Sequence, residues 1–233
     1  MYRYQVLIEY VGTSFVGWQI QKKGKSIQKI VQSILSKLLK EKIVLYGSGR
    51  TDAGVHACEQ SAHFDIKKKI QNIDKTIKSL NFFLNSKMIS IIKIKKKNFN
   101  FHARYSAKER IYVYLIQNRL SPSTINKDRE WHIRKKLDIN LIKKGCKKLV
   151  GTNDFSTFRA SNCSAKSPIR TINAILVSKS KNCIKLKFKS KSFLKNQVRS
   201  MVGCLKYLGE KKWDLKKFEN TIMKKDRKKV APP

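Results

Sequence analysis

One stretch of the chain, residues 47–56, combines residue types that could act in catalysis. It has glycines at positions 47, 49 and 54, and it places Arg50 two residues before Asp52. Glycine lets the backbone adopt positive φ and lets a bulky ligand approach closely. If the segment is locally extended, side chains two residues apart point to the same side. We therefore expect one guanidinium and one carboxylate to face a common ligand.

The flanking patterns predict that this stretch is a loop between two strands. Residues 43–46 are mostly apolar, and residues 61–66 alternate between polar and apolar types. A loop held by strands often carries catalytic groups, although a glycine-rich segment of this kind is also often only a turn. A phosphate-binding loop is excluded, because that motif ends in Gly-Lys-Ser/Thr and no lysine follows a glycine here.

Length and charge limit the class of protein. The 233 residues suit one large domain or two small ones. Lys and Arg number 53 against 15 Asp and Glu, which gives a formal net charge of +38. Such a charge favours a polyanionic partner, most simply RNA or DNA. A compositional bias of the genome is the alternative, because 42 of the basic residues are Lys and only 11 are Arg.

The cysteines indicate neither disulfides nor a metal site. The five cysteines are odd in number and widely separated, without a CxxC pair or a zinc-like Cys/His spacing. We expect reduced thiols, no metal and a cytoplasmic location. No apolar run approaches the ~20 residues that a membrane span needs, and the N-terminus shows no signal-peptide pattern.

Periodicity predicts a strand–helix order that is similar in the two halves, without a sequence repeat. A helix over residues 26–40 is capped by Ser26, another begins at Asp74, and the lysines at 95–97 suggest a boundary after residue 97. In the first half, to residue 97, the predicted strands are 4–11, 43–46, 61–66 and 89–94, and the predicted helices are 26–40 and 74–84.

The second half, residues 98–233, has the same kinds of pattern. Its helix over 193–208 is followed by Gly209, which we expect to end it. The predicted strands are 110–117, 170–177 and 183–188, and the predicted helices are 138–150, 193–208 and 214–225. We therefore expect an α+β fold of two similar modules, each an antiparallel sheet with helices on one face.

Residues 49–57 resemble the active-site loop of the tRNA pseudouridine synthase A family, in which an Arg-Thr-Asp run holds the catalytic aspartate. Shorter segments along the rest of the chain resemble other motifs of that family in the same order. They are residues 10–13, 17–21, 80–81, 101–107, 110–114, 151–155 and 198–203.

The resemblance implies that a uridine in the anticodon arm of tRNA is isomerised to pseudouridine in a cleft between the modules. It makes Asp52 the catalytic carboxylate, which attacks either C1′ of the sugar or C6 of the base. Arg199 would keep that carboxylate ionised, and its apolar neighbours predict a partly buried side chain. Arg50 would assist base flipping, and Tyr112 would stack on the uracil and assist proton transfer.

The resemblance also implies a set of tRNA contacts, a homodimer and no cofactor. It further implies that the family continues with a glycine and a final apolar strand after the position of residue 233, so we expect either that the sequence is truncated or that this strand is absent. His56 is expected to be structural. The implied RNA contacts are Phe101, His102, Ala103, Arg104, Tyr105, Arg119, Asn162, Cys163, Ser164, Ala165 and Lys166.

Two other functions use the same features. A basic RNA-binding protein without catalysis would need no Asp52, and a nucleotide-dependent enzyme would bind ATP or GTP at the glycine loop. Neither of these two functions predicts pseudouridine formation that depends on Asp52, whereas the resemblance to the synthase family does.

Overall fold

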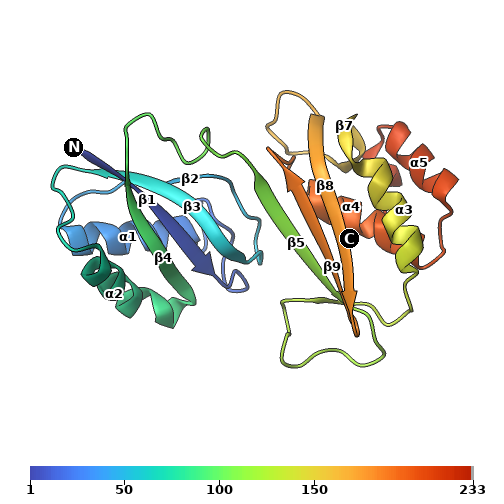
Figure 1. The fold of residues 1–233 in the computed structure, drawn as a ribbon, viewed down its shortest axis with the longest axis horizontal. Helices are drawn as coiled ribbons and strands as arrows, with labels where there is room; N and C mark the ends of the chain where they lie inside the picture. The colour runs from blue at the N-terminus through green and yellow to red at the C-terminus, as the bar shows by residue number, and fades with distance from the viewer. Residues whose placement is uncertain (232–233) are drawn as a thin grey trace. The chain divides into compact units, whose positions relative to one another are not determined.

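The computed structural model describes residues 1–231, apart from the side chain of Lys229. The chain forms two compact units, Met1–Ala107 and Lys108–Pro233. Both units combine one sheet with helices (Figure 1). The expected α+β fold of two similar modules is confirmed.

The sheet of the first unit is antiparallel, in the order β2-β3-β1-β4. Helices α1 and α2 lie on one of its faces (Figure 1). Its elements are β1 (Tyr2–Tyr10), α1 (Ile27–Leu39), β2 (Tyr46–Gly47), β3 (Ala57–Ile66), α2 (Ile73–Leu84), a 3-10 turn (Asn85–Lys87) and β4 (Ile89–Lys97).

The core of this unit follows the alternation of β1. Tyr4, Val6 and Ile8 point to the helical face and are at most 1% exposed. They pack with the buried stripe of α1, formed by Ile27, Val31 and Leu35. Alternate residues of β1 thus form one apolar face, and the apolar stripe of α1 packs on it, which buries one face of the sheet.

Two local predictions for the first unit were wrong. Asn72, not Asp74, caps α2, because its side chain accepts the Lys75 N–H at 2.8 Å. Residues 43–45 are not a strand. The Ile43 N–H donates to the Ser36 hydroxyl at 3.0 Å, and the Leu45 N–H donates to the Gln32 side chain at 3.1 Å, so side chains of α1 replace a strand partner.

The second unit has a five-stranded sheet in the order β6-β5-β9-β8-β7. Its pairs are antiparallel except for the short parallel pair of β5 and β6, and helices cover one face. Its elements are β5 (Arg110–Gln117), β6 (Trp131–His132), α3 (Ile139–Leu149), β7 (Gly151–Asp154), a 3-10 turn (Ser156–Phe158), β8 (Ile169–Ser180), β9 (Cys183–Ser190), α4 (Gln197–Gly209), α5 (Leu215–Met223) and a last 3-10 turn (Arg227–Lys229).

Helix α4 differs from its prediction at both ends. Asn196 adopts a left-handed conformation, with φ of 61°, so the helix begins at Gln197 rather than at residue 193. The Gln197 side chain accepts the Leu194 N–H at 2.8 Å and fixes this entry. Gly209 is the last helical residue and does not follow the helix.

Residues 98–107 belong to the first unit, although the lysines at 95–97 suggested a boundary before them. The Arg3 guanidinium donates to the carbonyl oxygens of Phe99 at 2.6 Å and Phe101 at 2.8 Å. The Ala103 N–H donates to His63 Nδ1 at 3.2 Å. The segment therefore packs on the side of the sheet that α1 and α2 leave uncovered.

Candidate active site

The loop between β2 and β3 is fixed at several points by hydrogen bonds to its backbone. The Ser48 N–H donates to the Ser61 carbonyl at 2.8 Å, and the Gln60 side chain donates to the Gly49 carbonyl at 2.7 Å. The Trp18 N–H donates to the Thr51 carbonyl at 3.1 Å. The strands and the segment after β1 together hold the loop in one conformation.

Two glycines let the segment after β1 lie directly against the loop. A Cβ atom on Gly12 would lie 2.0 Å from the Val55 carbonyl oxygen. Gly17 has a φ of +108°, and a Cβ there would lie 2.6 Å from the Thr51 carbonyl oxygen. Only glycine fits such contacts. The Gly12 N–H also donates to His56 Nδ1 at 3.0 Å, in agreement with the structural role expected for this histidine.

Arg50 and Asp52 are exposed, whereas Thr51 between them is turned inward. The Thr51 hydroxyl lies 2.8 Å from the hydroxyl of Tyr10, whose ring is buried. The Asp52 carbonyl accepts the Val55 N–H at 3.2 Å, which closes a turn directly after the carboxylate. The loop thus presents one guanidinium and one carboxylate to solvent on either side of an anchored residue.

Aromatic rings gather where residues 98–107 cross the sheet. His63 stacks on Tyr46 with 5.1 Å between ring centroids, and it lies 4.6 Å from His102, which in turn lies 4.5 Å from Tyr105. Tyr46 is 47% exposed and Tyr105 is 75% exposed. Two rings of the cluster therefore face solvent, and the Arg104 guanidinium lies 5.8 Å from the centroid of the Tyr105 ring.

His63 is buried at the centre of that cluster. Its burial lowers its pKa to about 4, and the nearby His102 and Arg3 act in the same direction. The neutral ring accepts the Ala103 N–H at Nδ1. Arg3 makes a two-point hydrogen bond to Asp65, at 2.8 and 2.7 Å, which lowers the pKa of that carboxyl. The sequence did not indicate a role for Tyr46 or His63. The two residues are brought together by the register of β2 and β3, in which Tyr46 pairs with His63.

In the second unit, Tyr112 lies on the helical face of β5. Its ring is half-buried and contacts Phe193 edge-on, with 5.0 Å between centroids. Arg199 lies on the first turn of α4 and is exposed, so the prediction of a partly buried side chain was wrong. Burial raises the pKa of Tyr114, and the charge of the nearby Arg199 opposes that shift. Arg199 therefore lies close to the face of β5 that carries both tyrosines.

The other residues proposed to contact RNA lie on loops. Arg119 is exposed, and its guanidinium donates to the carbonyls of Ser121 at 2.8 Å and Pro122 at 3.1 Å. The segment of residues 162–166 is held by Arg159, which donates to the Cys163 and Ala165 carbonyls at 3.0 and 2.5 Å. Within this segment Asn162, Ser164 and Lys166 are exposed.

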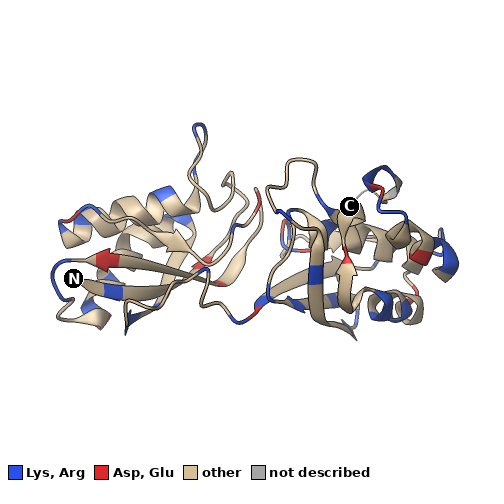
Figure 2. Ribbon diagram, turned by 90° about the horizontal axis from the view of Figure 1, so that it is seen from above, with Lys and Arg blue, Asp and Glu red and all other residues tan. Residues whose placement is uncertain are grey.

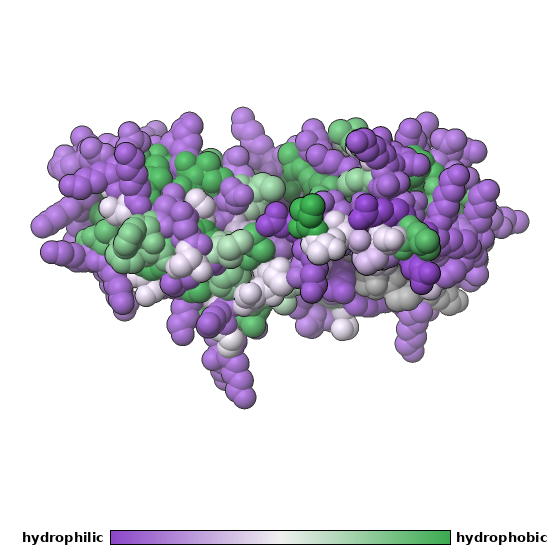
Figure 3. All heavy atoms as spheres, turned by 90° about the horizontal axis from the view of Figure 1, so that it is seen from below, coloured by the Kyte–Doolittle hydropathy of each residue, from purple (hydrophilic) through white to green (hydrophobic). Residues whose placement is uncertain are grey.

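Basic side chains dominate the surface. Lys and Arg positions occur on elements of both units and outnumber the acidic ones (Figure 2). Hydrophilic side chains cover most of the face in Figure 3, with apolar patches between them. Within residues 1–231 we find no group of three or more His, Cys, Asp or Glu placed to hold a metal. No helix in this part of the chain is both long and apolar enough to span a membrane.

Comparisons with known proteins identify the family of the chain. A family model described as tRNA pseudouridine synthase matches residues 6–106 and 146–233. The chain belongs to the tRNA pseudouridine synthase family. The match includes the whole loop and Arg199, whereas Tyr112 and Arg119 lie in the segment between the two matched ranges.

Two bacterial relatives are similar to the chain along its whole length. A protein named tRNA pseudouridine synthase A from Pelagibacter ubique (strain HTCC1062) is 66% identical over 233 residues, which are 100% of this chain and 95% of the relative. A protein of the same name from Paramagnetospirillum magneticum is 40% identical over 232 residues, covering 100% of this chain and 90% of the relative. Both units are therefore present in these tRNA pseudouridine synthases.

Proposed function

We propose that the protein isomerises uridine to pseudouridine in tRNA, with Asp52 as the catalytic carboxylate. The observation that carries this proposal is the anchored loop that exposes Asp52 beside Arg50, in a chain 66% identical to a tRNA pseudouridine synthase A. A non-catalytic RNA-binding role is not favoured, because both relatives bear the name of an enzyme.

The reaction requires one bond to be exchanged within a nucleoside. The bond between C1′ and N1 breaks, the base turns while it is held, and a bond between C1′ and C5 forms. The proton on C5 is then lost, and N1 gains one, so the atoms balance without an oxidant or a second substrate. An ionised carboxylate can form a transient covalent bond with C1′ or with C6, and the exposed Asp52 suits either role.

The uridine has to leave its stack before a carboxylate can reach it, at a cost of a few kcal/mol. We propose that the exposed Arg50 guanidinium occupies the space that the base leaves. Tyr112 would stack on the uracil and accept or relay the C5 proton, and Arg199 would be the counter-charge of Asp52.

We further propose that the modified uridines lie in the anticodon arm, and that the protein acts as a cytoplasmic homodimer. Phe101–Tyr105, Arg119 and residues 162–166 would contact the tRNA. The exposed ring of Tyr105 and the exposed Lys166 suit stacking and phosphate contacts respectively.

The test uses unmodified tRNA transcripts and chemical mapping of pseudouridine. We expect wild-type protein to form pseudouridine in the anticodon arm, and Asp52→Ala to form none while it binds tRNA with wild-type affinity. Product at equal rates from both proteins would remove Asp52 from the mechanism. Tight tRNA binding without product from wild-type protein would instead support the non-catalytic role.

A further inference from the structure

A pocket lies at one end of the second sheet, where β5 and β8 begin and β9 ends. Its volume is about 450 Å³. None of its lining residues belongs to the motifs that carry the family resemblance or to the implied RNA contacts. They are Lys108, Ile169, Arg170, Thr171, Asn173, Ser190, Lys191 and Ser192.

The lining is suited to an anion. It contributes three cations, Lys108, Arg170 and Lys191, together with hydroxyl and amide groups, and no carboxylate. The nearby acid Glu109 faces Lys189, at 4.0 Å, and Asn173, at 3.5 Å. Two of the three cations, Lys108 and Lys191, are exposed, so the pocket opens to solvent. Lysine and arginine are the usual partners of phosphate oxygens.

The floor of the pocket is held in place before any ligand binds. The buried Ser190 hydroxyl lies 2.7 Å from the Thr171 carbonyl oxygen and 2.8 Å from the Ser192 carbonyl oxygen, so its single proton can be donated to either, and its oxygen accepts the Ser192 N–H at 3.2 Å. The Arg110 guanidinium donates to the Lys191 carbonyl, which fixes the backbone beneath that lysine. A preformed site loses less conformational entropy when it binds a ligand.

Arg170 has an unused donor. Its Nη1 donates to the carbonyls of Ser167 at 2.9 Å and Ile169 at 2.6 Å. Its Nε is buried, and no described residue accepts a hydrogen bond from it. A buried donor without an acceptor is rare and costs about 1–3 kcal/mol. A small turn of the guanidinium toward a bound anion would pair this donor and keep the positive charge in the pocket.

We propose that this pocket binds a phosphate group of the tRNA backbone. The proposal rests on the proposed function, because it takes tRNA as the polyanion. The same chemistry would accept a free inorganic phosphate, and competition between phosphate and tRNA separates the two sources.

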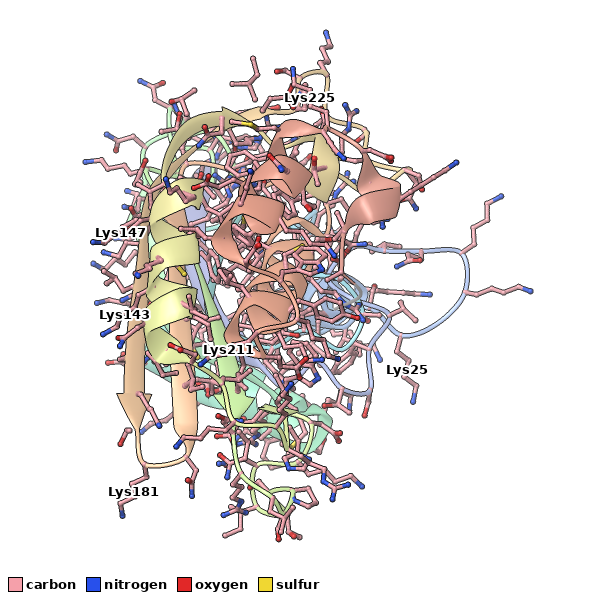
Figure 4. The ribbon with its side chains drawn as sticks, turned by 90° about the vertical axis from the view of Figure 1, so that its right-hand side faces the viewer. Lys25, Lys143, Lys147, Lys181, Lys211 and Lys225 are labelled. Atoms are coloured by element: carbon pink, nitrogen blue, oxygen red, sulfur yellow. The ribbon has the colours of Figure 1, made fainter. Side chains whose placement is uncertain are left out.

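The main variant is Lys108→Gln/Lys191→Gln, because both side chains are exposed and their replacement should leave the fold intact. The control is Lys179→Gln/Lys181→Gln, which removes the same charge from the β8–β9 hairpin near its turn, where Lys181 is labelled in Figure 4. The opposite end of the hairpin carries Ser190 and the pocket.

We would measure the tRNA dissociation constant at several salt concentrations. We expect the pocket variant to bind tRNA about tenfold more weakly than the control variant. The slope of the logarithm of the binding constant against the logarithm of the salt concentration should be smaller in magnitude by about one for each phosphate that is no longer neutralised. Arg170→Lys, checked for folding by thermal melting, should weaken binding in the same direction. Equal affinity and equal slope in the pocket and control variants would overturn the proposal.

Titration with inorganic phosphate, followed by NMR of the amide signals of Thr171 and Ser192, distinguishes the sources. Phosphate binding that weakens tRNA binding competitively supports the proposal. Phosphate binding without any effect on tRNA affinity overturns it in favour of a free-phosphate site. Pseudouridine formation by wild-type protein is assayed alongside, so that a failure of the proposed function is seen separately.

Discussion

His63 links the interior of the first unit to the segment that carries the proposed RNA contacts. It is 1% exposed, and its Nδ1 accepts the Ala103 N–H, so the ring holds that segment only while Nδ1 lacks a proton. The family resemblance pointed to Phe101–Tyr105 as RNA contacts, but the sequence did not predict that His63 holds this segment in place. The alternating pattern around His63 does not predict a hydrogen bond to Ala103, which is 40 residues away in the sequence.

The pKa of His63 predicts a pH dependence of folding. The unfolded ring has a pKa near 6.5 and the folded ring one of about 4, so between these values only the unfolded chain gains a proton. Stability should therefore be complete above pH 6.5 and fall by about 3 kcal/mol as the pH drops toward 4. The lowered pKa of Asp65 acts only at lower pH, below its ordinary value of 3.8.

Urea unfolding at pH 7 and at pH 4.5 tests this prediction with wild type, His63→Asn and the half-buried control His132→Asn. His63→Asn should be less stable at pH 7 but should lose less stability on acidification than the other two proteins. The same pH dependence in all three would show that His63 does not titrate as described.

At the scale of elements, alternation and capping predicted most of the strands and helices. Residues 110–117 form the predicted strand, and Ser26 caps the predicted helix α1. The errors arose where side chains replaced backbone partners, as Ser36 and Gln32 do for residues 43–45. The two-residue strand β6 was missed, because its pairing with β5 depends on tertiary contacts rather than on its own pattern.

The placement of the proposed catalytic loop depends on the segment after β1. Gly12→Ala would place a methyl group 2.0 Å from the Val55 carbonyl, so either the segment or the loop must move. We expect kcat to fall by about tenfold or more with a smaller change in tRNA affinity, because small misplacement of a reacting group is costly. Ser14→Ala, at an exposed position of the same segment, is the matched control and should behave like wild type.

A Gly12→Ala protein with unchanged kcat would show that the loop does not need this close approach. Thermal melting of the variant separates a local displacement from general loss of the fold.

At the scale of the whole molecule, the proposed mechanism joins residues of both units. Asp52 belongs to the first unit and Arg199 to the second. Sequence resemblance suggested this pair, whereas composition and periodicity carried no information on it. Both side chains are exposed, so each is accessible to a charged partner or to the substrate.

Arg199→Ala should therefore abolish most of the activity without unfolding the second unit. The exposed Lys195, just before α4, provides the control Lys195→Ala. Pseudouridine formation on tRNA transcripts is the measurement, because Arg199 is proposed as the counter-charge of the reacting carboxylate. Equal activity of the two alanine variants would exclude Arg199 from the mechanism.

The central claim is that the anchored loop presents a single carboxylate that acts on uridine. The most direct measurement is the release of tritium from tRNA labelled at C5 of uridine, for wild type, Asp52→Asn and Glu59→Gln. Asn keeps the size of Asp52 without its charge, and Glu59 is an exposed carboxylate at the start of β3. We predict release by wild type and Glu59→Gln and none by Asp52→Asn. Release at the wild-type rate by Asp52→Asn would contradict the account.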